Sequence, residues 1–245
     1  MKILGIDIGG SAVKGALVDT QTGKLIGERH RIETTGKLTP AAMAKTIAEI
    51  ARHHRWKGAI GVGFPGVIHG SRILTSANLH EKFCGCDAVK LFSRATGCSV
   101  ALVNDADAAG LAEMTFGAGR GCEGTVLLLT LGTGVGSALF CGGRLYPNSE
   151  LGHLPIRGKS AERFVSSAAR KRRDVSWEKW GGELSDYLGT LEKILWPELI
   201  IIGSGVSAKH KKFFPFIKSR AKLVSAEFLN EAGIVGAALW AAEVK

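Results

Sequence analysis

The chain contains no apolar run close to the roughly 20 residues that span a bilayer, which excludes a helical membrane protein. Its first apolar stretch is broken by Asp7 after only four residues, too early for the apolar core of a secretory signal. Cysteine is scarce and odd in number, with five residues, so no disulfide framework is indicated. Cys84 and Cys86 form the one close pair, and no second pair follows at zinc-site spacing. We therefore expect a cytoplasmic protein with reduced, mostly packed thiols.

Acidic residues are also in short supply, with 22 Asp and Glu against 32 Lys and Arg, which gives a formal net charge of +10. Such a field attracts polyanions, namely nucleic acid, phosphorylated metabolites or inorganic phosphate chains, although a basic surface kept for solubility explains the composition equally well. With 45% apolar and 22% charged residues in a length of 245, the chain is typical of a globular protein with one large domain or two small ones.

Short apolar segments separated by glycine-containing turns predict a series of strands in the first half of the chain. Between them, the pair Thr39 and Pro40 is typical of a helix start, and apolar residues then recur on one helical face. The expected elements are strands over residues 3–8, 12–19, 25–32, 59–64 and 100–103, a helix from Pro40 to about His54 and an alanine-rich helix over 108–116.

The opening pattern of strand, small-residue loop and strand recurs in the second half. The segment 7–11 aligns with 130–134, and we interpret this as an internal duplication whose period is far too long for a solenoid. The expected elements are strands over 126–131, 135–140, 144–146 and 199–202, helices over 177–196 and 230–244, and otherwise helix after Ser160.

The duplication predicts a two-lobed α/β protein with a central cleft. We expect a small N-terminal α/β lobe over residues 1–110 and a larger C-terminal α/β lobe over 111–245. The last helix is alanine-rich and therefore narrow, and it is expected to pack back on the N-terminal lobe. A tryptophan-rich region with Trp177, Trp180 and Trp196 is expected to be exposed, which favours a homodimer.

Three glycine-containing loops follow apolar strands, at residues 9–11, 132–134 and 203–205. Without Cβ atoms, backbone N–H groups in such loops can close on phosphate oxygens, although ordinary hairpin turns use glycine as well. Two loops at matched positions of a duplication indicate a polyphosphate chain held from both sides of a cleft. The chain has no Walker A sequence and no Gly-x-Gly-x-x-Gly at a strand-to-helix turn, so P-loop and Rossmann sites are excluded.

Two charged residues flank the first of these loops. Asp7 lies in an apolar strand, where a carboxylate is costly unless it is paired or binds a metal ion, and we expect it near Mg²⁺ through water. A solvated strand end is the alternative. Lys14, on the strand that leaves the loop, is either a phosphate ligand or an exposed strand lysine.

Two further polar pairs are candidates for chemistry. Asn104 and Asp105 follow an apolar strand and precede a helix, so they are either a helix cap or, in a sugar kinase, the site of a base that accepts a hydroxyl proton. Glu150 and His153 place an acid and an imidazole three residues apart, which fits a polar site or a pair on one helix face.

Several motifs follow one another in a fixed order from Lys2 to about Ala242. They are Asp7-Ile8-Gly9-Gly10-Ser11-x-x-Lys14, Gly63-Phe64-Pro65-Gly66, Val103-Asn104-Asp105-Ala106, Leu131-Gly132-Thr133-Gly134-Val135-Gly136, Glu150-Leu151-Gly152-His153 and Gly203-Ser204-Gly205-Val206-Ser207. The ordered set resembles the ROK family of sugar kinases and repressors. The resemblance implies the actin-like, hexokinase-type, ribonuclease H-like fold, in agreement with the duplication.

Within the family, the chain resembles the polyphosphate glucokinases and glucomannokinases. The similarity lies in the compact length, in the segment 159–162 that follows the Glu150 motif, and in the segment 176–180. Many other members carry a zinc site whose cysteines follow the Gly-His element. No cysteine occurs after Cys141, so no zinc is expected and His153 is available for substrate.

The resemblance also implies roles for individual residues. Asp105 is implied as the general base for the 6-hydroxyl group of the sugar. The implied ligands of the sugar hydroxyls are Asn78, Asn104, Glu150, His153 and Glu162. The implied ligands of the phosphoryl donor are Gly9, Gly10, Ser11, Lys14, Thr133 and Gly134, with Gly203 and Gly205 on the adenosine side, where Gly-Ser-Gly replaces the common Gly-Gly-Gly.

The expected reaction is Mg²⁺-dependent phosphorylation of glucose with inorganic polyphosphate, ATP or both as donor. Basic clusters at 170–173, 209–212 and 218–222 are either solvated helix faces or a surface for a long phosphate chain. Alternatives are a strictly ATP-dependent glucokinase, a kinase of mannose or an N-acetylated sugar, and a sugar-responsive regulatory protein. Repressors of the family carry a helix-turn-helix segment ahead of the first strand, for which a strand beginning at Lys2 leaves no room. No nucleic-acid or membrane partner is expected.

Overall fold

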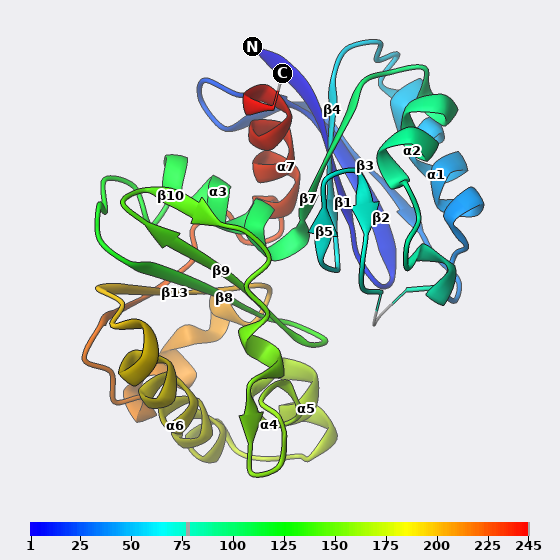
Figure 1. Ribbon diagram of the computed structural model, residues 1–245. Coiled ribbons are helices and arrows are strands. Elements are labelled where there is room, and N and C mark those ends of the chain that lie inside the picture. Colours follow the sequence, from blue (N-terminus) through cyan, green and yellow to red (C-terminus); the bar gives the residue numbers. More distant parts are fainter. Residues whose placement is uncertain (77–78, 245) are drawn as a thin grey trace. The chain divides into compact units, whose positions relative to one another are not determined.

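The structure is a computed structural model that describes residues 1–76 and 79–244 (Figure 1). The chain forms two compact units. Unit 1 consists of residues 1–112 and 231–245, and unit 2 consists of residues 113–230. Within the described residues, no helix is both long and apolar enough to cross a membrane.

The described part of unit 1 is built on a five-stranded sheet in the order β3-β2-β1-β4-β7. The first three strands form antiparallel pairs, whereas β1, β4 and β7 run parallel. The elements are β1 (Lys2–Ile8), β2 (Ala12–Asp19), β3 (Lys24–Glu33), α1 (Pro40–His53), β4 (Ile60–Phe64), β5 (Ile68–His69), β6 (Arg72–Ile73), η1 (Glu81–Phe83), α2 (Ala88–Thr96), β7 (Val100–Asn104), α3 (Asp105–Phe116), which runs on into unit 2, and α7 (Ala232–Glu243).

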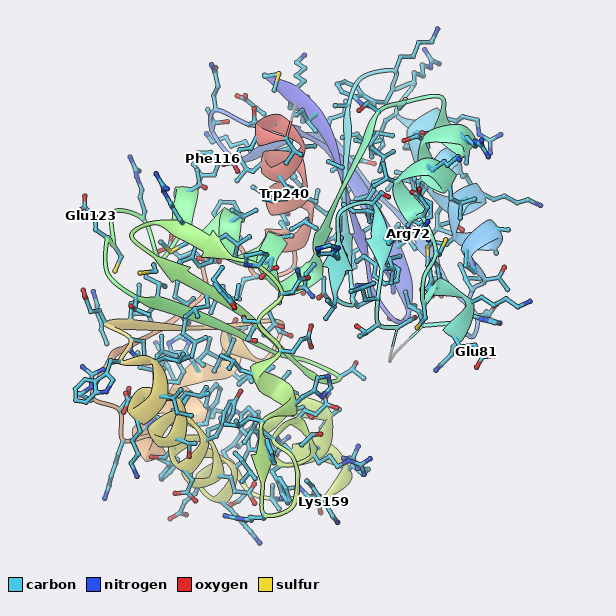
Figure 2. All side chains as sticks on the ribbon, in the orientation of Figure 1. Arg72, Glu81, Phe116, Glu123, Lys159 and Trp240 are labelled. Atoms are coloured by element: carbon cyan, nitrogen blue, oxygen red, sulfur yellow. The ribbon has the colours of Figure 1, made fainter. Side chains whose placement is uncertain are left out.

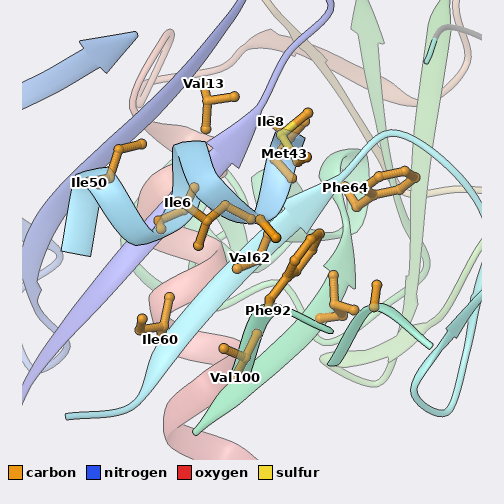
Figure 3. Packing of buried hydrophobic residues seen from close by; sticks show 14 of the residues in the cluster. Ile6, Ile8, Val13, Met43, Ile50, Ile60, Val62, Phe64, Phe92 and Val100 are labelled. Carbon is orange, nitrogen blue, oxygen red and sulfur yellow. The ribbon is translucent and has the colours of Figure 1, made fainter. Parts of the chain in front are cut away.

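One face of this sheet is covered by α1 and α2. Ile6 of β1 and Val62 of β4 pack with Met43 of α1 and Phe92 of α2 in a core that water does not reach (Figure 3). Neighbouring residues of a strand point to opposite faces, so Gly5 and Gly61 lie on the face away from this core. The alternation therefore leaves a glycine-lined surface for a second layer.

That second layer is α7, which lies directly on the backbone of the sheet. Gly5 and Gly61 are neighbours in the β1–β4 pairing. A Cβ atom on Gly5 would come within 2.0 Å of the Ile234 carbonyl oxygen, and one on Gly61 within 1.8 Å of the Ala237 carbonyl oxygen. Only glycine permits so close an approach, because any other residue would push the helix away. Trp240 lies on the same helix (Figure 2).

The described part of unit 2 repeats the topology with a sheet in the order β10-β9-β8-β13-β14. Again the first three strands pair antiparallel, and β8, β13 and β14 run parallel. The elements are β8 (Val126–Leu131), β9 (Val135–Cys141), β10 (Arg144–Tyr146), η2 (Leu151–His153), β11 (Pro155–Ile156), β12 (Lys159–Ser160), α4 (Glu162–Val165), α5 (Ser167–Arg172), α6 (Trp177–Leu195), β13 (Leu199–Gly203), η3 (Ser207–Lys212), η4 (Phe214–Phe216) and β14 (Lys222–Ser225).

The internal duplication is confirmed by these two sheets. Strands β1, β2, β3, β4 and β7 correspond in order and direction to β8, β9, β10, β13 and β14. The prediction of a single strand after Ser160, at 199–202, was wrong because β14 follows it. Its four residues are half-buried or exposed and lie at the edge of the sheet, so no apolar run marks the strand.

Three further expectations are corrected by the structure. Trp180 is completely buried, so the tryptophan-rich region is exposed only in part, with Trp196 at 66%. Of the five cysteines, all of which lie in the described part of the chain and are free, only Cys98 is buried, so the thiols are not mostly packed. The alanine-rich helix begins at Asp105 rather than at residue 108, because Asn104 caps it.

The buried face of α6 carries two aromatic polar groups whose hydrogen-bonding capacity is unused. Trp180 and Tyr187 are completely buried, and within the described residues neither the Trp180 Nε1 atom nor the Tyr187 hydroxyl has a hydrogen-bond partner. Burial raises the pKa of the Tyr187 phenol, because the phenolate would lose its hydration. Tyr187 therefore contributes to this core only through its ring.

Replacing Tyr187 by phenylalanine is expected to raise the free energy of unfolding by about 1 kcal/mol, because a buried polar group without a partner costs stability. Urea denaturation of the two proteins measures the difference. Tyr146→Phe is the matched control, since Tyr146 is 64% exposed. A loss of stability in Tyr187→Phe would contradict the expectation.

Glu113 is a completely buried carboxylate at the beginning of unit 2. Its Oε1 atom accepts hydrogen bonds from the amides of Glu227 (2.9 Å) and Phe228 (2.8 Å), and its Oε2 atom accepts one from the Ala118 amide (3.0 Å). The chain passes between the units at residues 112/113 and 230/231. Glu113 thus ties together the two segments of unit 2 that lead into unit 1.

Candidate active site

The polar residues of unit 1 lie at the carboxyl ends of its three parallel strands. Asp7 of β1 is paired with Gly63 of β4, and Gly63 with Val103 of β7. Two strand spacings therefore separate Asp7 from β7, or about 10 Å across the sheet. Asp105 follows two residues after Val103, and a Cβ atom on Gly63 would lie 3.7 Å from the Asp105 Cα atom. The sheet thus brings two carboxylates to one of its edges.

Asp7 and Lys14 face each other across the β1–β2 hairpin. They are partners in the strand register, and the Lys14 Nζ atom lies 3.5 Å from the Asp7 Oδ2 atom. Burial raises the pKa of the Asp7 carboxyl group, and the Lys14 ammonium group opposes that rise. Gly233, in the first turn of α7, approaches so closely that a Cβ atom there would lie 2.9 Å from the Asp7 Oδ1 atom. Asp7 is therefore held between a lysine and a helix N-terminus.

The loop of this hairpin is short and open. The Gly9 amide donates to the Ala12 carbonyl oxygen (3.0 Å), and the Ser11 carbonyl oxygen accepts from the Thr34 amide (3.0 Å). Gly10 and Ser11 are exposed, and a Cβ atom on Gly10 would meet nothing within 4 Å. Backbone amides of the loop are thus available to an anion.

Asn104 acts as the cap of α3. Its Oδ1 atom accepts from the amides of Ala106 (2.8 Å) and Asp107 (3.1 Å), and its Nδ2 atom donates to the Gly66 carbonyl oxygen (3.1 Å). The Ala106 amide also lies 2.9 Å from the Asp105 Oδ1 atom. The helix-cap interpretation of this pair is confirmed for Asn104. The Asn104 Nδ2 atom retains one N–H group, which could donate a hydrogen bond to a sugar hydroxyl.

Two of the glycine-containing loops come together in unit 2. Thr130 of β8 and Gly203 of β13 are register partners, so both strands end at the same edge. A Cβ atom on Gly132 would lie 3.4 Å from the Ser204 Oγ atom, which places the loop 132–134 against the loop 203–205. This edge corresponds to the edge of unit 1 that carries Asp7 and Asp105.

The Val135 backbone brings the polar residues of unit 2 together. Its amide donates to the Glu162 Oε2 atom (3.4 Å), and a Cβ atom on Gly152 would lie 2.2 Å from its carbonyl oxygen. Gly152 belongs to the short helix η2, at whose ends Glu150 and His153 lie. The Glu150 Oε2 atom lies 3.5 Å from the His153 Nε2 atom. Two carboxylates and an imidazole thus gather at the start of β9.

Burial raises the pKa of the Glu150 carboxyl group, while His153 opposes the rise and the nearby Glu162 adds to it. Such a group of exposed and half-buried acceptors and donors suits a ligand with several hydroxyl groups.

The structure thus assembles the site residues expected from the sequence in two groups, each described within its own unit. Asp7, Lys14, Asn104 and Asp105 share an edge in unit 1, and Glu150, His153 and Glu162 share one in unit 2. Asn78 lies outside the described residues. Gly152 and Gly233 were not predicted from the sequence, although their lack of a side chain lets η2 and α7 approach. The small residues of the last helix were the available signal for Gly233.

Comparison with known proteins gives a consistent result. The model of the family described as the ROK family matches residues 3–166. A polyphosphate glucokinase from Mycobacterium tuberculosis (strain CDC 1551 / Oshkosh) is 44% identical over 236 residues, which cover 96% of this chain and 89% of that protein.

Solved structures are similar over nearly the whole chain. The crystal structure of an inorganic polyphosphate/ATP-glucomannokinase from Arthrobacter sp. strain KM superposes with a TM-score of 0.94 at 42% identity and covers 98% of both chains. A ROK family glucokinase from Streptomyces griseus, in complex with glucose and AMPPNP, superposes with a TM-score of 0.81 at 21% identity, covering 97% of this chain and 98% of that one. The second similarity concerns the fold alone.

Proposed function

Because this chain belongs to the ROK family, we propose that it is a kinase that transfers the terminal phosphoryl group of inorganic polyphosphate or ATP to the 6-hydroxyl group of glucose. The observation that carries the proposal is similarity over almost the full length, above 40% identity, to two enzymes whose names specify polyphosphate and a hexose. The two matched α/β units predicted from the duplication are confirmed, and so is the actin-like fold type that the family resemblance implied.

In the proposed reaction, the 6-hydroxyl oxygen of glucose attacks the terminal phosphorus atom of the donor. The bond between that phosphorus and the bridging oxygen breaks, and the shortened phosphate chain or ADP leaves with the electron pair. We assign the hydroxyl proton to the Asp105 carboxylate, which lies at the end of β7. Glu150, His153, Glu162 and Asn104 are assigned to the sugar hydroxyls, and so is Asn78, which lies outside the described residues.

The loops 9–11 and 132–134 are assigned to the phosphoryl donor, with Lys14 as a further cation. In each loop an internal backbone hydrogen bond fixes the turn, from Gly9 to Ala12 and from Gly132 to Gly134, at 3.0 Å in both. Fixed amide donors can stabilise the charge that develops on the transferred group without reorganising during the reaction.

Asp7 has the chemistry of a Mg²⁺ ligand. It is a single, largely desolvated carboxylate beside a loop assigned to phosphate, and magnesium is commonly bound through one or two carboxylates with water and substrate phosphates completing its shell. Bound Mg²⁺ would offset negative charge on the donor oxygens. Asp7 would hold it, and Lys14 would then be released from its ion pair to bind phosphate.

Use of ATP as a second donor is supported by the loop 203–205. Ser204 is the middle residue of this loop, at a position where glycine is common. Its backbone nevertheless has a φ of 73°, in the left-handed region that favours glycine. The Ser204 carbonyl oxygen accepts from the Ser207 amide (3.0 Å) and hydroxyl (2.8 Å), which fixes this conformation. The loop thus keeps a glycine-type backbone despite the substitution.

Initial rates with glucose and Mg²⁺, using either long-chain polyphosphate or ATP, test the proposal. We expect formation of glucose 6-phosphate with polyphosphate and also with ATP. The same assay with mannose in place of glucose measures the range of sugars that the enzyme accepts. Asp105→Asn is the control for contaminating kinases. Activity with ATP alone would contradict the polyphosphate part, and no hexose phosphorylation with either donor would contradict the whole proposal.

The pH dependence of glucose binding is expected to report on Glu150. As the pH falls through the raised pKa of Glu150, the carboxylate takes up a proton and loses its charge, so the KM for glucose should rise. This rise should begin at a higher pH than the titration of an ordinary glutamate would give. Steady-state rates at several pH values measure it. In Glu150→Gln the KM for glucose should be higher at neutral pH and should no longer rise as the pH falls. If the KM of the variant still rises over the same pH range, the titrating group is a different one.

The homodimer and the cytoplasmic location expected from the sequence belong to this proposal as well. Ile194 and Trp196 lie 61% and 66% exposed around the C-terminal end of α6, which supports an association surface there. Light scattering of the wild type and of Trp196→Ala tests the oligomeric state, and cell fractionation tests the location.

A further inference from the structure

Unit 2 carries exposed cations that the proposed reaction does not use. Lys171 and Arg172 lie on α5, and Lys209, Lys211 and Lys212 lie on η3. Within the described part of the chain, none of the five forms an ion pair. These residues, called here the basic surface, are therefore available to a ligand in solution.

The neighbours of Lys171 and Arg172 in the sequence have a different role. The Arg170 guanidinium group lies 3.9 Å from the centre of the Trp177 ring, and its Nη1 atom donates to the Val175 carbonyl oxygen (2.9 Å). Arg173 donates to both carboxylate oxygens of Glu183, at 2.8 and 2.6 Å. The basic run 170–173 is thus divided: its outer members fix α5 to α6, and its inner members remain exposed.

The first part of the basic surface begins beside the donor loop. The Ala168 amide donates to the Gly132 carbonyl oxygen (3.1 Å), so the start of α5 contacts the loop 132–134. With a rise of about 1.5 Å per residue, Lys171 and Arg172 follow within about 6 Å along the helix. Their side chains are long enough to extend the positive field outward from the loop.

The second part begins at the loop 203–205, which lies against the same loop. Ser204, which is in contact with Gly132, accepts the hydrogen bonds that start η3 at Ser207. The lysines at 209, 211 and 212 follow Ser207 within five residues on η3, which is kinked at Lys209. Both cation groups therefore have their inner ends at the loop assigned to the donor.

An aromatic stack joins the outer ends. Phe213, directly after Lys212, stacks on Trp177 with ring centres 6.0 Å apart and an interplanar angle of 18°, and Trp177 in turn carries Arg170. The carboxylates of Asp174 and Glu178 are exposed in the same region, so the five cations of the basic surface stand against two acids. The stack fixes the distance between the end of η3 and the start of α6. The exposed charge in this region is net positive.

We propose that the basic surface binds the distal part of a long polyphosphate chain whose terminal phosphate is held at the loop 132–134. The inference rests on the proposed function and adds a donor subsite to it. Polyphosphate carries a negative charge on every unit, and the ammonium groups of lysine contact such a chain as mobile point charges without fixing its register. A donor of three phosphates ends at the loop, whereas a long chain continues over the cations.

The test is a triple variant, Lys209→Ala, Lys211→Ala and Lys212→Ala, with a matched triple variant of exposed unit 1 lysines, Lys45→Ala, Lys57→Ala and Lys90→Ala, that has the same net charge. For long-chain polyphosphate, the first variant should show a KM raised about tenfold at an unchanged kcat, because three surface cations no longer attract the chain. The slope of log KM against log salt should fall by about two, at about 0.7 for each phosphate that is no longer neutralised. ATP and tripolyphosphate should be used as before, and the control variant should resemble the wild type.

The outcomes separate this inference from the proposed function. If the wild type uses long-chain polyphosphate and both variants have the same KM and salt slope, the inference is overturned while the proposed function stands. If the wild type does not use polyphosphate, the polyphosphate part of the proposed function fails as well. An equal rise in KM for ATP and tripolyphosphate would also overturn the inference, since it would place the lysines at the reaction centre. Thermal unfolding of each variant excludes a folding defect.

Discussion

Replacing Asp105 by alanine is expected to lower kcat by about 10²–10⁴-fold while glucose still binds, because the variant has no group at the end of β7 to accept the hydroxyl proton. The position is fixed by the backbone, since Asp105 is the first residue of α3 and follows a cap made by Asn104. Steady-state kinetics give kcat, and calorimetric titration of the inactive variant with glucose gives the dissociation constant.

Two further variants make this prediction sharper. Asp105→Asn keeps the size of the side chain and an oxygen that can accept from the Ala106 amide, and it should be nearly as inactive as the alanine variant. Asp19→Asn changes a half-buried carboxylate at the other end of the β1–β2 hairpin, and it should retain normal turnover. Near-normal turnover in Asp105→Ala would refute the assignment of the base, whereas loss of glucose binding would make Asp105 a sugar ligand instead.

Replacing Glu113 by alanine is expected to lower the free energy of unfolding by about 3–5 kcal/mol. The change leaves the amides of Ala118, Glu227 and Phe228, whose hydrogen bonds are part-buried, without the acceptor that the completely buried carboxylate supplies. A buried donor that loses its partner costs about 1–3 kcal/mol, and three of them together exceed the effect of an ordinary substitution. Chemical denaturation followed by tryptophan fluorescence measures the loss.

The matched variants distinguish the effect of the hydrogen bonds from the effect of side-chain volume. Glu113→Gln retains one carbonyl oxygen and should cost less, about 1–3 kcal/mol. Glu123→Ala removes an exposed glutamate of the same unit (Figure 2) and should change stability by less than about 0.5 kcal/mol. Equal stability of Glu113→Ala and Glu123→Ala would show that the three amides find other partners.

The burial of Glu113 and its hydrogen-bond partners could not be predicted from the sequence. Its neighbours in the chain are apolar or small, and a glutamate within a helix is ordinarily interpreted as a solvated residue. Its partners at 227 and 228 are more than 110 residues away, so no local pattern indicates them. Arg170 and Arg173 have partners nearer in the chain, Trp177 and Glu183, but these lie on another helix, so the spacing within one helix does not indicate them. Long-range partners decide whether a charge is exposed, and sequence spacing does not contain them.

The strands and their loops were predictable because their signals are local. The ranges 12–19 and 126–131 are strands as expected, and the matched loops at 9–11 and 132–134 follow from apolar segments that end in small residues. The repetition of that pattern was sufficient to predict two equivalent sheets. The missed strand β14 has a counterpart in β7, so the duplication itself contained the information that its own residues lacked.

The amino-acid sequence alone determined the two matched α/β units and the small-residue loops at which their first strands end. These depend on periodicity and on glycine, which act over a few residues. Only the tertiary structure decided which cations remain exposed, which tryptophan is buried, and how Val135 joins Gly152 and Glu162. Those outcomes depend on the approach of segments distant in the chain, where a missing Cβ atom or a single buried carboxylate determines the packing.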